Sequence, residues 1–458
     1  MPMTRREFLI RFGAAGALTS FDCFTALNAL AITPEVTGYK ALVCVFLLGG
    51  NDGNNTIIPI DPSEYSSTYG MVRTTADIAI PQASLLPLTQ AGAATRFGLH
   101  PGLSGLQNLW DRKRLAVLFN VGTLVEPLTK ADYASGRKPE KLFSHSDQQR
   151  EWQAALSIAQ NRSGWAGRIA DNLNAANGYG PIPMAISIAG SSLFLTGNTT
   201  SSLAIPAGGS FNLSGFTSDT DMSRYAAMRQ LAAIDRDNRF INSAGDVMDS
   251  ALATSAVLDP IINPATGSAA LQALAALNTP LANQLLQAAR LIEARDTLSM
   301  KRQIFFVALN GFDTHGNQLL VQQNLFAQLG PALQTFADAT EALGVANNVT
   351  TFTLSDFGRT LKPASGGGSD HAWGNHHFII GGAVNGGDFY GTFPTLRLGN
   401  DSADDISNEG RWLPTTALDQ YAATLATWFG VSPADLPYVL PNIGRFQSSD
   451  LGFLSSQA

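Results

Sequence analysis

The stretch ALVCVFLLGGNDGNNT, residues 41–56, is the part of this 458-residue chain that decides the expected fold. Residues 41–48 are continuously apolar and do not alternate with polar residues, as in a strand that helices cover on both faces of a parallel sheet. The glycine-rich polar residues 49–56 then predict a turn at the carboxyl end of that strand. Ligands of open α/β sheets bind at this end, so the turn containing Asp52 is a first candidate for a site.

Strands and helices are predicted to alternate along most of the chain. Further apolar runs occupy residues 115–121, 182–188, 304–309 and 349–354. Helical patterns occupy residues 104–112, 148–156, 270–297, 319–343 and 417–428. This alternation predicts an α/β fold with a mainly parallel central sheet flanked by helices. Residues 190–297 begin with loop-forming residues and continue in Ala- and Leu-rich helices, so we expect an insertion or cap within a single domain spanning residues 38–458.

The N-terminus has the layout of a twin-arginine export signal. Arg5 and Arg6 precede an apolar segment, and a small-x-small cleavage site follows at residues 29–31. Asp22 interrupts the apolar stretch before it reaches the ~20 residues of a spanning helix. We therefore expect residues 1–31 to be a signal peptide and the Tat translocase to be a partner during export. The mature protein would be periplasmic, secreted or on the cell surface, with no stable membrane span.

Composition and charge argue against several classes of function. The net charge of −7 and the lack of a basic run in the mature chain argue against nucleic acid as a partner. Cys23 falls in the signal and Cys44 in an apolar run, so the mature chain is expected to have no internal disulfide. A redox enzyme is disfavoured, because we find neither a glycine-rich dinucleotide fingerprint after a strand nor a cysteine set for an iron–sulfur cluster.

Three of the apolar runs end in acidic turns. Asp52, Asp313 and Asp356 each follow such a run, and His315 lies two residues after Asp313. If the three strands are neighbours, these carboxylates and this imidazole meet at one edge of the sheet. Anionic oxygens and a neutral imidazole on rigid strand ends suit a divalent metal ion. A single aspartate after a strand is often only a turn or cap residue, so the prediction depends on the three together.

Histidines concentrate in the same part of the sequence. The chain has six, and His371, His376 and His377 follow the glycine run at residues 366–368, which suits a loop that folds over a site. We expect His371 and His376 to be metal ligands. A purely structural role is the alternative for this segment, with Asp370 capping a turn and His377 packing beneath the apolar residues that follow it.

Ser144, His145 and Arg359 are the candidate catalytic residues. Ser144 and His145 lie where a helix is predicted to begin, and free N–H groups and the helix dipole stabilise negative charge there. Ser144 is therefore a nucleophile or an anion-binding residue, or it is an ordinary helix cap. Arg359 can neutralise an oxygen of a phosphate or sulfate, or it can form a structural ion pair with a nearby carboxylate.

At these motifs the chain resembles a bacterial family catalogued as domain of unknown function 1501 (DUF1501). The matching blocks are LLGGNDG at residues 47–53, GFDTH at 311–315, SDFGRT at 355–360 and DHAWG at 370–374. Members of this family typically carry twin-arginine signals, and the family is grouped with the alkaline phosphatase and sulfatase superfamily. The resemblance therefore implies an α/β sandwich whose strand ends hold one or two metal ions.

The superfamily pattern also implies roles for individual residues. Asp52 matches the aspartate after the first strand, and Ser144 matches the nucleophile that begins a helix. The later ligands would be Asp313, His315, Asp356 and His371. Two features depart from the pattern. Phe357 stands where alkaline phosphatases have a histidine, so one metal site is altered or lost, and the sulfatase motif with its proline and arginine is missing around Ser144.

Together these features predict an exported metal-dependent hydrolase of phosphate or sulfate esters, acting on a small anionic ester or on a decorated polymer. One or two divalent ions would be the cofactor, and zinc, manganese, calcium and magnesium are all candidates. The nucleophile would be Ser144 or a water molecule. The alternative is a non-catalytic exported binding or assembly protein that keeps the fold.

Overall fold

The computed structural model describes residues 38–156, 162–178, 180–211, 219–234, 239–399 and 402–455. The expected export signal, residues 1–31, lies outside the described residues. The described residues from Tyr39 onward belong to one compact unit. Over these same ranges, no helix combines the length and the apolar character that crossing a membrane requires.

Within the described residues, nine strands form the central sheet of this unit. Their order is β13 (Asp388–Tyr390), β5 (Leu115–Gly122), β12 (Asn375–Gly381), β9 (Val349–Ser355), β1 (Lys40–Leu48), β8 (Arg302–Asn310), β6 (Ala185–Ser187) and β7 (Leu203–Ala204), with β14 (Thr416–Ala417) also on β5. β12 runs antiparallel to both of its neighbours, and the other pairings are parallel. The predicted α/β fold with a mainly parallel sheet is therefore confirmed, and the five predicted strands correspond to β1, β5, β6, β8 and β9.

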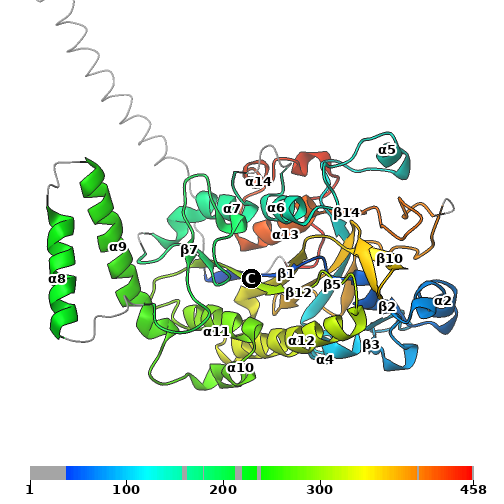
Figure 1. The fold of residues 1–458 in the computed structure, drawn as a ribbon, viewed down its shortest axis with the longest axis horizontal. Coiled ribbons are helices and arrows are strands. Elements are labelled where there is room, and N and C mark those ends of the chain that lie inside the picture. Colours follow the sequence, from blue (N-terminus) through cyan, green and yellow to red (C-terminus); the bar gives the residue numbers. More distant parts are fainter. Residues whose placement is uncertain are drawn as a thin grey trace, which may run out of the picture. The chain divides into compact units, whose positions relative to one another are not determined.

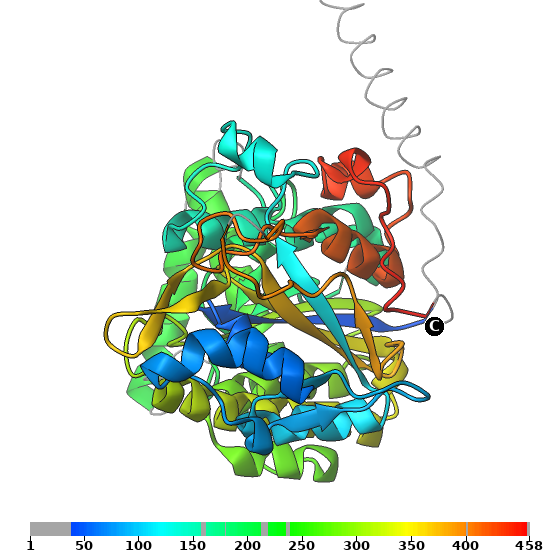
Figure 2. The ribbon, with the colours of Figure 1, turned by 90° about the vertical axis from the view of Figure 1, so that its right-hand side faces the viewer.

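Helices cover both faces of the sheet (Figures 1 and 2). One layer contains α4 (Ser104–Asp111), α10 (Gln272–Leu277), α11 (Pro280–Glu293) and α12 (Gln318–Ala342). The opposite layer contains α6 (His145–Ala154), α7 (Trp165–Leu173), α13 (Leu418–Phe429) and α14 (Leu436–Val439). Because both faces are covered, residues 41–46 of β1 are completely buried, and this explains why their sequence is continuously apolar.

Smaller elements surround this core. A three-stranded sheet contains β2 (Ile57–Pro59), β4 (Phe97–Leu99) and β3 (Leu86–Leu88), and a hairpin contains β10 (Arg359–Ala364) and β11 (Gly368–His371). Short helices α2 (Pro62–Ser67), α3 (Tyr69–Arg73) and α5 (Lys130–Ala134) follow loops between strands. In the segment expected to be an insertion, α8 (Asp219–Ala233) and α9 (Arg239–Ile262) contact each other, whereas α11 packs on β8.

The middle of the sheet brings three acidic turns to one edge. β1 lies between β9 and β8, with Leu48 paired to Asn310 and Leu47 paired to Ser355. The turns after these strands therefore begin at the same level of the sheet, as the sequence predicted for neighbouring strands. Gly49 is required here: its φ is +114°, and a Cβ on it would lie 2.4 Å from the backbone nitrogen of Asp313.

Candidate metal centre

Three imidazoles converge on one carboxylate oxygen at this edge. The Nε2 atoms of His145, His315 and His371 lie 3.3, 3.1 and 3.3 Å from Oδ1 of Asp313. The Nε2 atoms of His315 and His371 are themselves 2.9 Å apart. Because His145, Asp313 and His371 each offer a ligand atom within 4.8 Å of the others, they form a group that can hold a metal ion.

The four residues come from three separate segments of the chain. His145 is the first residue of α6, Asp313 and His315 lie in the loop after β8, and His371 ends β11. The β10–β11 hairpin passes close to the β8 loop, because a Cβ on Gly368 would lie only 2.2 Å from the backbone of His315. A glycine at this position therefore allows His371 and His315 to meet.

Each of the three rings has its other nitrogen held by an acceptor. Nδ1 of His145 donates to Oδ2 of Asp356 at 2.7 Å, and Nδ1 of His371 donates to the carbonyl oxygen of Phe143 at 2.8 Å. Nδ1 of His315 lies 3.2 Å from Oδ1 of Asp370. Outer-shell acceptors of this kind fix the tautomer of metal-binding histidines and leave the Nε2 lone pair free for the metal.

This tautomer places several lone pairs close together. A carbonyl oxygen can only accept, so the neutral ring of His371 carries its proton on Nδ1 and presents an Nε2 lone pair to His315. Burial lowers the pKa of His371, which disfavours a second proton on that ring. Nε2 of His145 is buried and has no hydrogen-bond partner among the described residues. A cation at the centre would satisfy all of these nitrogens.

The spacing of these atoms agrees with a metal ligand set. Two ligand atoms bound at about 2.0–2.1 Å to a tetrahedral zinc ion lie roughly 3.3 Å apart. The separations between the Nε2 atoms of His145, His315 or His371 and Oδ1 of Asp313 are 3.1–3.3 Å. An imidazole-rich set suits zinc and other transition metals, whereas calcium and magnesium prefer oxygen ligands.

His145 and Asp313 both have shifted pKa values. The hydrogen bond to Asp356 raises the pKa of His145, although burial opposes this. Burial raises the pKa of Asp313, but the hydrogen bond and charge of Arg359 outweigh it, and His145 and His315 add to the lowering. The net pKa of Asp313 therefore lies below its ordinary value, which keeps this ligand anionic.

Arg359, predicted to be catalytic, is buried beneath the centre, and each of its three guanidinium nitrogens has an acceptor. Its guanidinium donates to the carbonyl oxygens of Gly49, Gly50, Phe312 and Ser369. It also forms an ion pair with Oδ1 of Asp313. Arg359 therefore joins three loops and positions Asp313, and these contacts occupy the donors that a substrate oxyanion would need.

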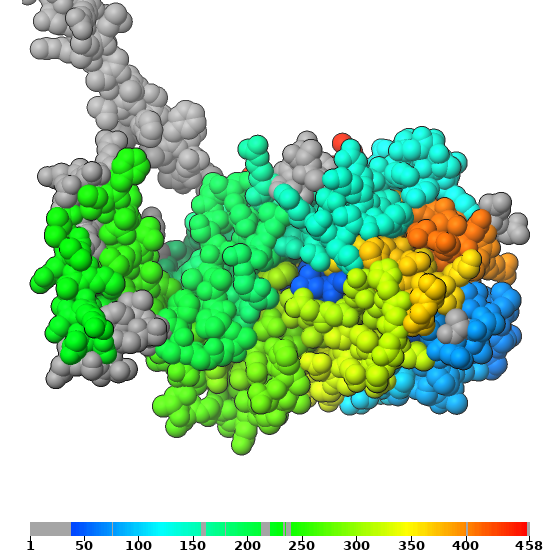
Figure 3. All heavy atoms as spheres, in the orientation of Figure 1, coloured from blue at the N-terminus to red at the C-terminus, as the bar shows by residue number. Residues whose placement is uncertain are grey.

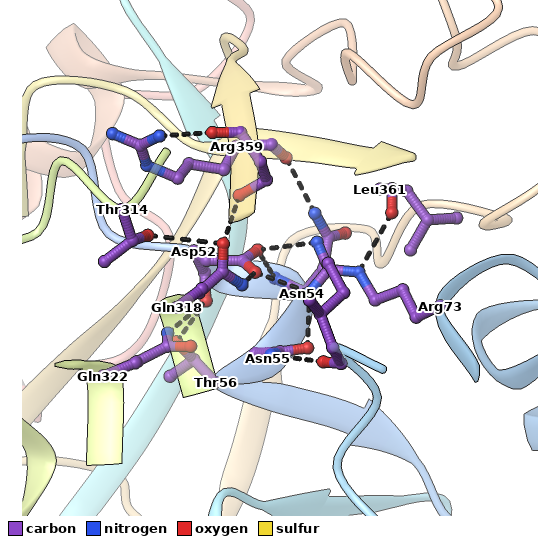
Figure 4. A network of polar contacts seen from close by, with 12 residues as sticks. Asp52, Asn54, Asn55, Thr56, Arg73, Thr314, Gln318, Gln322, Arg359 and Leu361 are labelled. Carbon is purple, nitrogen blue, oxygen red and sulfur yellow. Dashed lines mark hydrogen bonds and ion pairs between the residues drawn. The ribbon is translucent and has the colours of Figure 1, made fainter. Parts of the chain in front are cut away.

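Asp52, predicted to be a metal ligand, lies in a buried polar network that extends through Asn54 to Arg359 (Figure 4). Its Oδ2 accepts from Nη1 of Arg73 and from Nε2 of Gln318, both at 2.5 Å. Its Oδ1 accepts from the backbone nitrogen of Asn54 at 3.0 Å and from Nη2 of Arg73 at 3.2 Å. Both side chains of the Asp52–Arg73 pair are completely buried. The arrangement is that of a structural ion pair, and we leave Asp52 out of the proposed ligand set.

Asp356 lies behind His145 and not among the Nε2 atoms of the three histidines. Besides His145, its carboxylate accepts from the backbone nitrogen of Gly49 at 3.1 Å and from Nε2 of Gln149 at 2.8 Å. The ring of Phe357 packs against the rings of His145 and His371, with centroids 4.7 and 4.6 Å apart. The aromatic ring of Phe357 therefore lines one side of the cluster.

His376, also predicted to be a ligand, lies apart from this group. It is buried, its Nδ1 accepts from the backbone nitrogen of Asn120 at 3.1 Å, and its ring packs against those of Phe119 and Phe393. Burial lowers its pKa to about 3. These contacts indicate a neutral structural histidine.

Ser144 occupies the N-cap position of α6, directly before His145. Its side chain makes no capping hydrogen bond, and its Oγ lies 3.3 Å from Oγ of Ser146. The positive end of the α6 dipole is therefore placed beside the histidine cluster without a side-chain cap.

Solvent reaches the cluster, because the side chains of Asp313 and His315 are 47% and 46% exposed. Figure 3 shows a hollow between the cyan-green and yellow-green segments, with blue atoms at its floor.

Sequence reasoning did not assign the residues that orient the histidines. Asp370 was considered only as a turn cap, and its carboxylate faces His315. Gln149 and the carbonyl of Phe143 were not considered. Gln149 could have been found, because it lies four residues after His145 and so on the same face of a helix. The carbonyl of Phe143 leaves no signal in the sequence.

Fold and site together define an α/β protein that gathers histidines and a carboxylate at the carboxyl ends of its central strands. A family model described as "Protein of unknown function (DUF1501)" matches residues 39–411, and the chain belongs to this family. The predicted family resemblance is thereby confirmed.

Other comparisons add distant structural relatives only. No curated protein matches the sequence. The solved structure titled "Crystal structure of Ps i-CgsB" is 8% identical, with a TM-score of 0.33, covering 90% of this chain and 78% of that chain. A second one, "Crystal structure of Ps i-CgsB in complex with k-i-k-neocarrahexaose", is 10% identical, with a TM-score of 0.32, covering 89% and 77%.

Proposed function

We propose that this protein is an exported hydrolase of phosphate or sulfate esters that depends on one divalent metal ion. The observation that carries the proposal is the convergence of three Nε2 atoms on Oδ1 of Asp313. His145, Asp313, His315 and His371 would hold the ion. The proposed ligand set keeps three of the six residues expected from the sequence and adds His145, which was expected to be catalytic. The packing of Phe357 against two of the histidines favours one ion over two.

The ligand chemistry narrows the choice of metal. Imidazole nitrogens favour zinc, whereas calcium, magnesium and manganese prefer oxygen ligands. A divalent ion held at this centre would polarise an ester oxygen and lower the pKa of a water molecule there. The chain's own part is to keep Asp313 anionic through Arg359 and to keep the three rings in the correct tautomer.

The start of α6 supports an anionic substrate. His145 belongs to the cluster and is the first residue of this ten-residue helix, so the N-terminal N–H groups of α6 lie beside the centre. These groups and the helix dipole attract a phosphate or sulfate group. Because Arg359 is occupied by carbonyl oxygens and Asp313, we assign the binding of the anion to α6 in its place.

Ser144 is the candidate nucleophile. It precedes His145 directly, its Oγ is not used as a helix cap, and the superfamily places its nucleophile at the start of a helix. Replacing Ser144 with alanine distinguishes the two routes. Loss of turnover with retained metal supports Ser144 as the nucleophile, whereas full turnover assigns this role to water.

The proposal also includes an alkaline phosphatase or sulfatase-like fold and a location outside the cytoplasm after twin-arginine export. A mainly parallel sheet, covered by helices and carrying the site at its strand ends, is what an alkaline phosphatase or sulfatase-like fold requires. The ligands are spread from residue 145 to residue 371, so the centre forms only after the chain has folded. Twin-arginine export, which carries folded proteins, would allow the ion to be loaded before the protein leaves the cytoplasm.

The test combines metal analysis with a substrate panel. Protein from native export is analysed for zinc and manganese, then assayed on aryl phosphates, phosphodiesters and aryl sulfates. We expect about one ion per chain, and Asp313→Asn should lose both metal and turnover. Asp338→Asn is the matched control, because Asp338 is an exposed aspartate paired with Arg112. Folded wild-type protein without metal would overturn the proposal. Metal without turnover on any ester class would favour the non-catalytic binding protein.

A further inference from the structure

A second group of carboxylates lines a small cavity between α6 and α13. The cavity has a volume of about 40 Å³, and its lining includes Thr123, Glu140, Glu151, Asp419 and Asn442. Glu151 is 4% exposed and Asp419 is 2% exposed, whereas Glu140 is at the surface. Buried acids are rare unless they are paired, so two in one cavity need a partner.

Asp419 is the clearest sign of a missing partner. It lies in the first turn of α13, and its Oδ1 is buried with no hydrogen-bond partner among the described residues. Two cations, Arg168 and Arg445, act on Asp419, and both donate to backbone carbonyl oxygens. Arg168 donates to those of Val439, Ser163 and Ala154, and Arg445 donates to that of Val125. One oxygen of a fully buried carboxylate therefore lines the cavity without a donor.

Glu151 is held by polar donors, the side chains of Gln148 and Thr123. Its Oε2 accepts from Nε2 of Gln148 at 2.8 Å, and Gln148 in turn accepts from Oγ1 of Thr123 at 2.9 Å. Within the described part of the chain, no ion pair involves Glu151 or Asp419. Asp147 and Glu140 add negative charge near Glu151. Burial raises the pKa of both Glu151 and Asp419 to about 7, although the charges of Arg168 and Arg445 oppose the rise for Asp419.

We propose that this cavity is a cation site, separate from the histidine centre, that takes a hard divalent cation such as calcium through Glu151 and Asp419. The donors are oxygens without imidazole, which is the ligand type that calcium and magnesium prefer. A site for one water-sized particle needs about 10–15 Å³ on the same scale, so the cavity has room for an ion with a water molecule. Exposed Glu140 would attract the cation to the opening.

The position of the cavity gives this cation a structural role. Glu151 and His145 lie on the same helix, α6, and Gln149 of that helix holds Asp356 behind His145. A cation that binds Glu151 and Asp419 would join α6 to α13 and so hold His145 in place. The site would support the histidine centre from a distance without contacting substrate.

The test measures calcium and magnesium binding to the full-length chain carrying His371→Ala, which disables the histidine centre. We expect about one calcium ion per chain and a higher midpoint of thermal unfolding with calcium. Adding Asp419→Asn or Glu151→Gln should weaken calcium binding by about tenfold or more, because each removes a charged ligand. Both variants preserve side-chain shape, and circular dichroism checks that they fold.

Asp405→Asn is the matched control. Asp405 is equally buried, but its oxygens accept from backbone nitrogens of Gly399 and Ser407 at 3.1 and 3.0 Å. Calcium binding should be unchanged in this variant. The proposal is overturned if neither cation binds to the His371→Ala chain, or if binding survives Asp419→Asn undiminished.

Discussion

Nε2 of His315 lies 2.9 Å from Nε2 of His371, although Nδ1 of each ring already faces an oxygen acceptor. Two neutral rings in this tautomer would direct lone pairs at each other. The contact is therefore stable only with a positive charge, such as a metal ion, between the rings. Loss of either ring should weaken the binding of that ion.

His315→Ala and His371→Ala should each weaken zinc or manganese binding by more than about 100-fold, since the loss of an orienting partner alone costs about 10–100-fold. Competition with a chromogenic chelator measures the affinity. His376→Asn is the control, because an asparagine oxygen can still accept from the backbone nitrogen of Asn120. If His376→Asn loses metal to the same degree, the proposed ligand set is wrong.

Asp370→Asn tests the outer shell. Its carboxylate orients His315 through Nδ1, and an amide is a weaker acceptor that does not fix the tautomer. We expect metal affinity to fall about 10–100-fold with little change in stability. The exposed Asp388→Asn variant, which alters contacts with Gln90 and with the backbone nitrogen of Phe389, should retain full affinity. Equal affinities for the two variants would remove Asp370 from the site.

Asp52→Asn should affect stability much more than metal content. Asp52 and Arg73 form a completely buried ion pair, and breaking one partner leaves an uncompensated charge. The expected cost is about 3–5 kcal/mol of unfolding free energy, measured by denaturant titration. Under native conditions the folded fraction should still bind metal stoichiometrically. Metal-free folded Asp52→Asn protein would restore Asp52 as a ligand.

The raised pKa of Glu151 predicts that the stability of chelator-treated protein depends on pH. Burial raises its pKa from 4.5 to about 7 in the folded state. Between these two pH values the folded protein therefore binds more protons than the unfolded chain. The contribution of Glu151 to the free energy of unfolding is complete below pH 4.5 and is lost as the pH rises through 7. The loss should be about 3 kcal/mol by pH 8.

Glu151→Gln removes this titration. Denaturant unfolding at pH 5 and pH 8 should therefore show a smaller loss of stability in Glu151→Gln than in the wild type. Glu140→Gln, at the exposed rim of the same cavity, should keep most of the loss, because the charge of Glu140 raises the pKa of Glu151 much less than burial does. A difference between wild type and Glu151→Gln that stays constant with pH would contradict the buried-acid interpretation.

Much of the fold could be predicted from local patterns. The apolar runs predicted β1, β5, β6, β8 and β9, and the helical periodicity predicted α4, α6, α12 and α13 within a few residues. The direction of β12 could not be predicted, because a buried antiparallel strand has the same continuously apolar sequence as its parallel neighbours. The cluster itself was predicted only in part: His145 was considered as a catalytic residue, and its contact with His371 depends on how α6 meets the β10–β11 hairpin.

The sequence by itself determined the strands, their acidic turns and the types of residue that gather at the sheet edge, since periodicity and turn chemistry act over a few residues. The tertiary structure decided which of these side chains face one another. Asp52 and Asp313 follow neighbouring strands, yet Asp52 turns to Arg73, which lies 21 residues later in the chain, while Asp313 meets three histidines. A carboxylate turns toward the cation or donors that stand within reach, and only the packing of distant segments determines which groups those are.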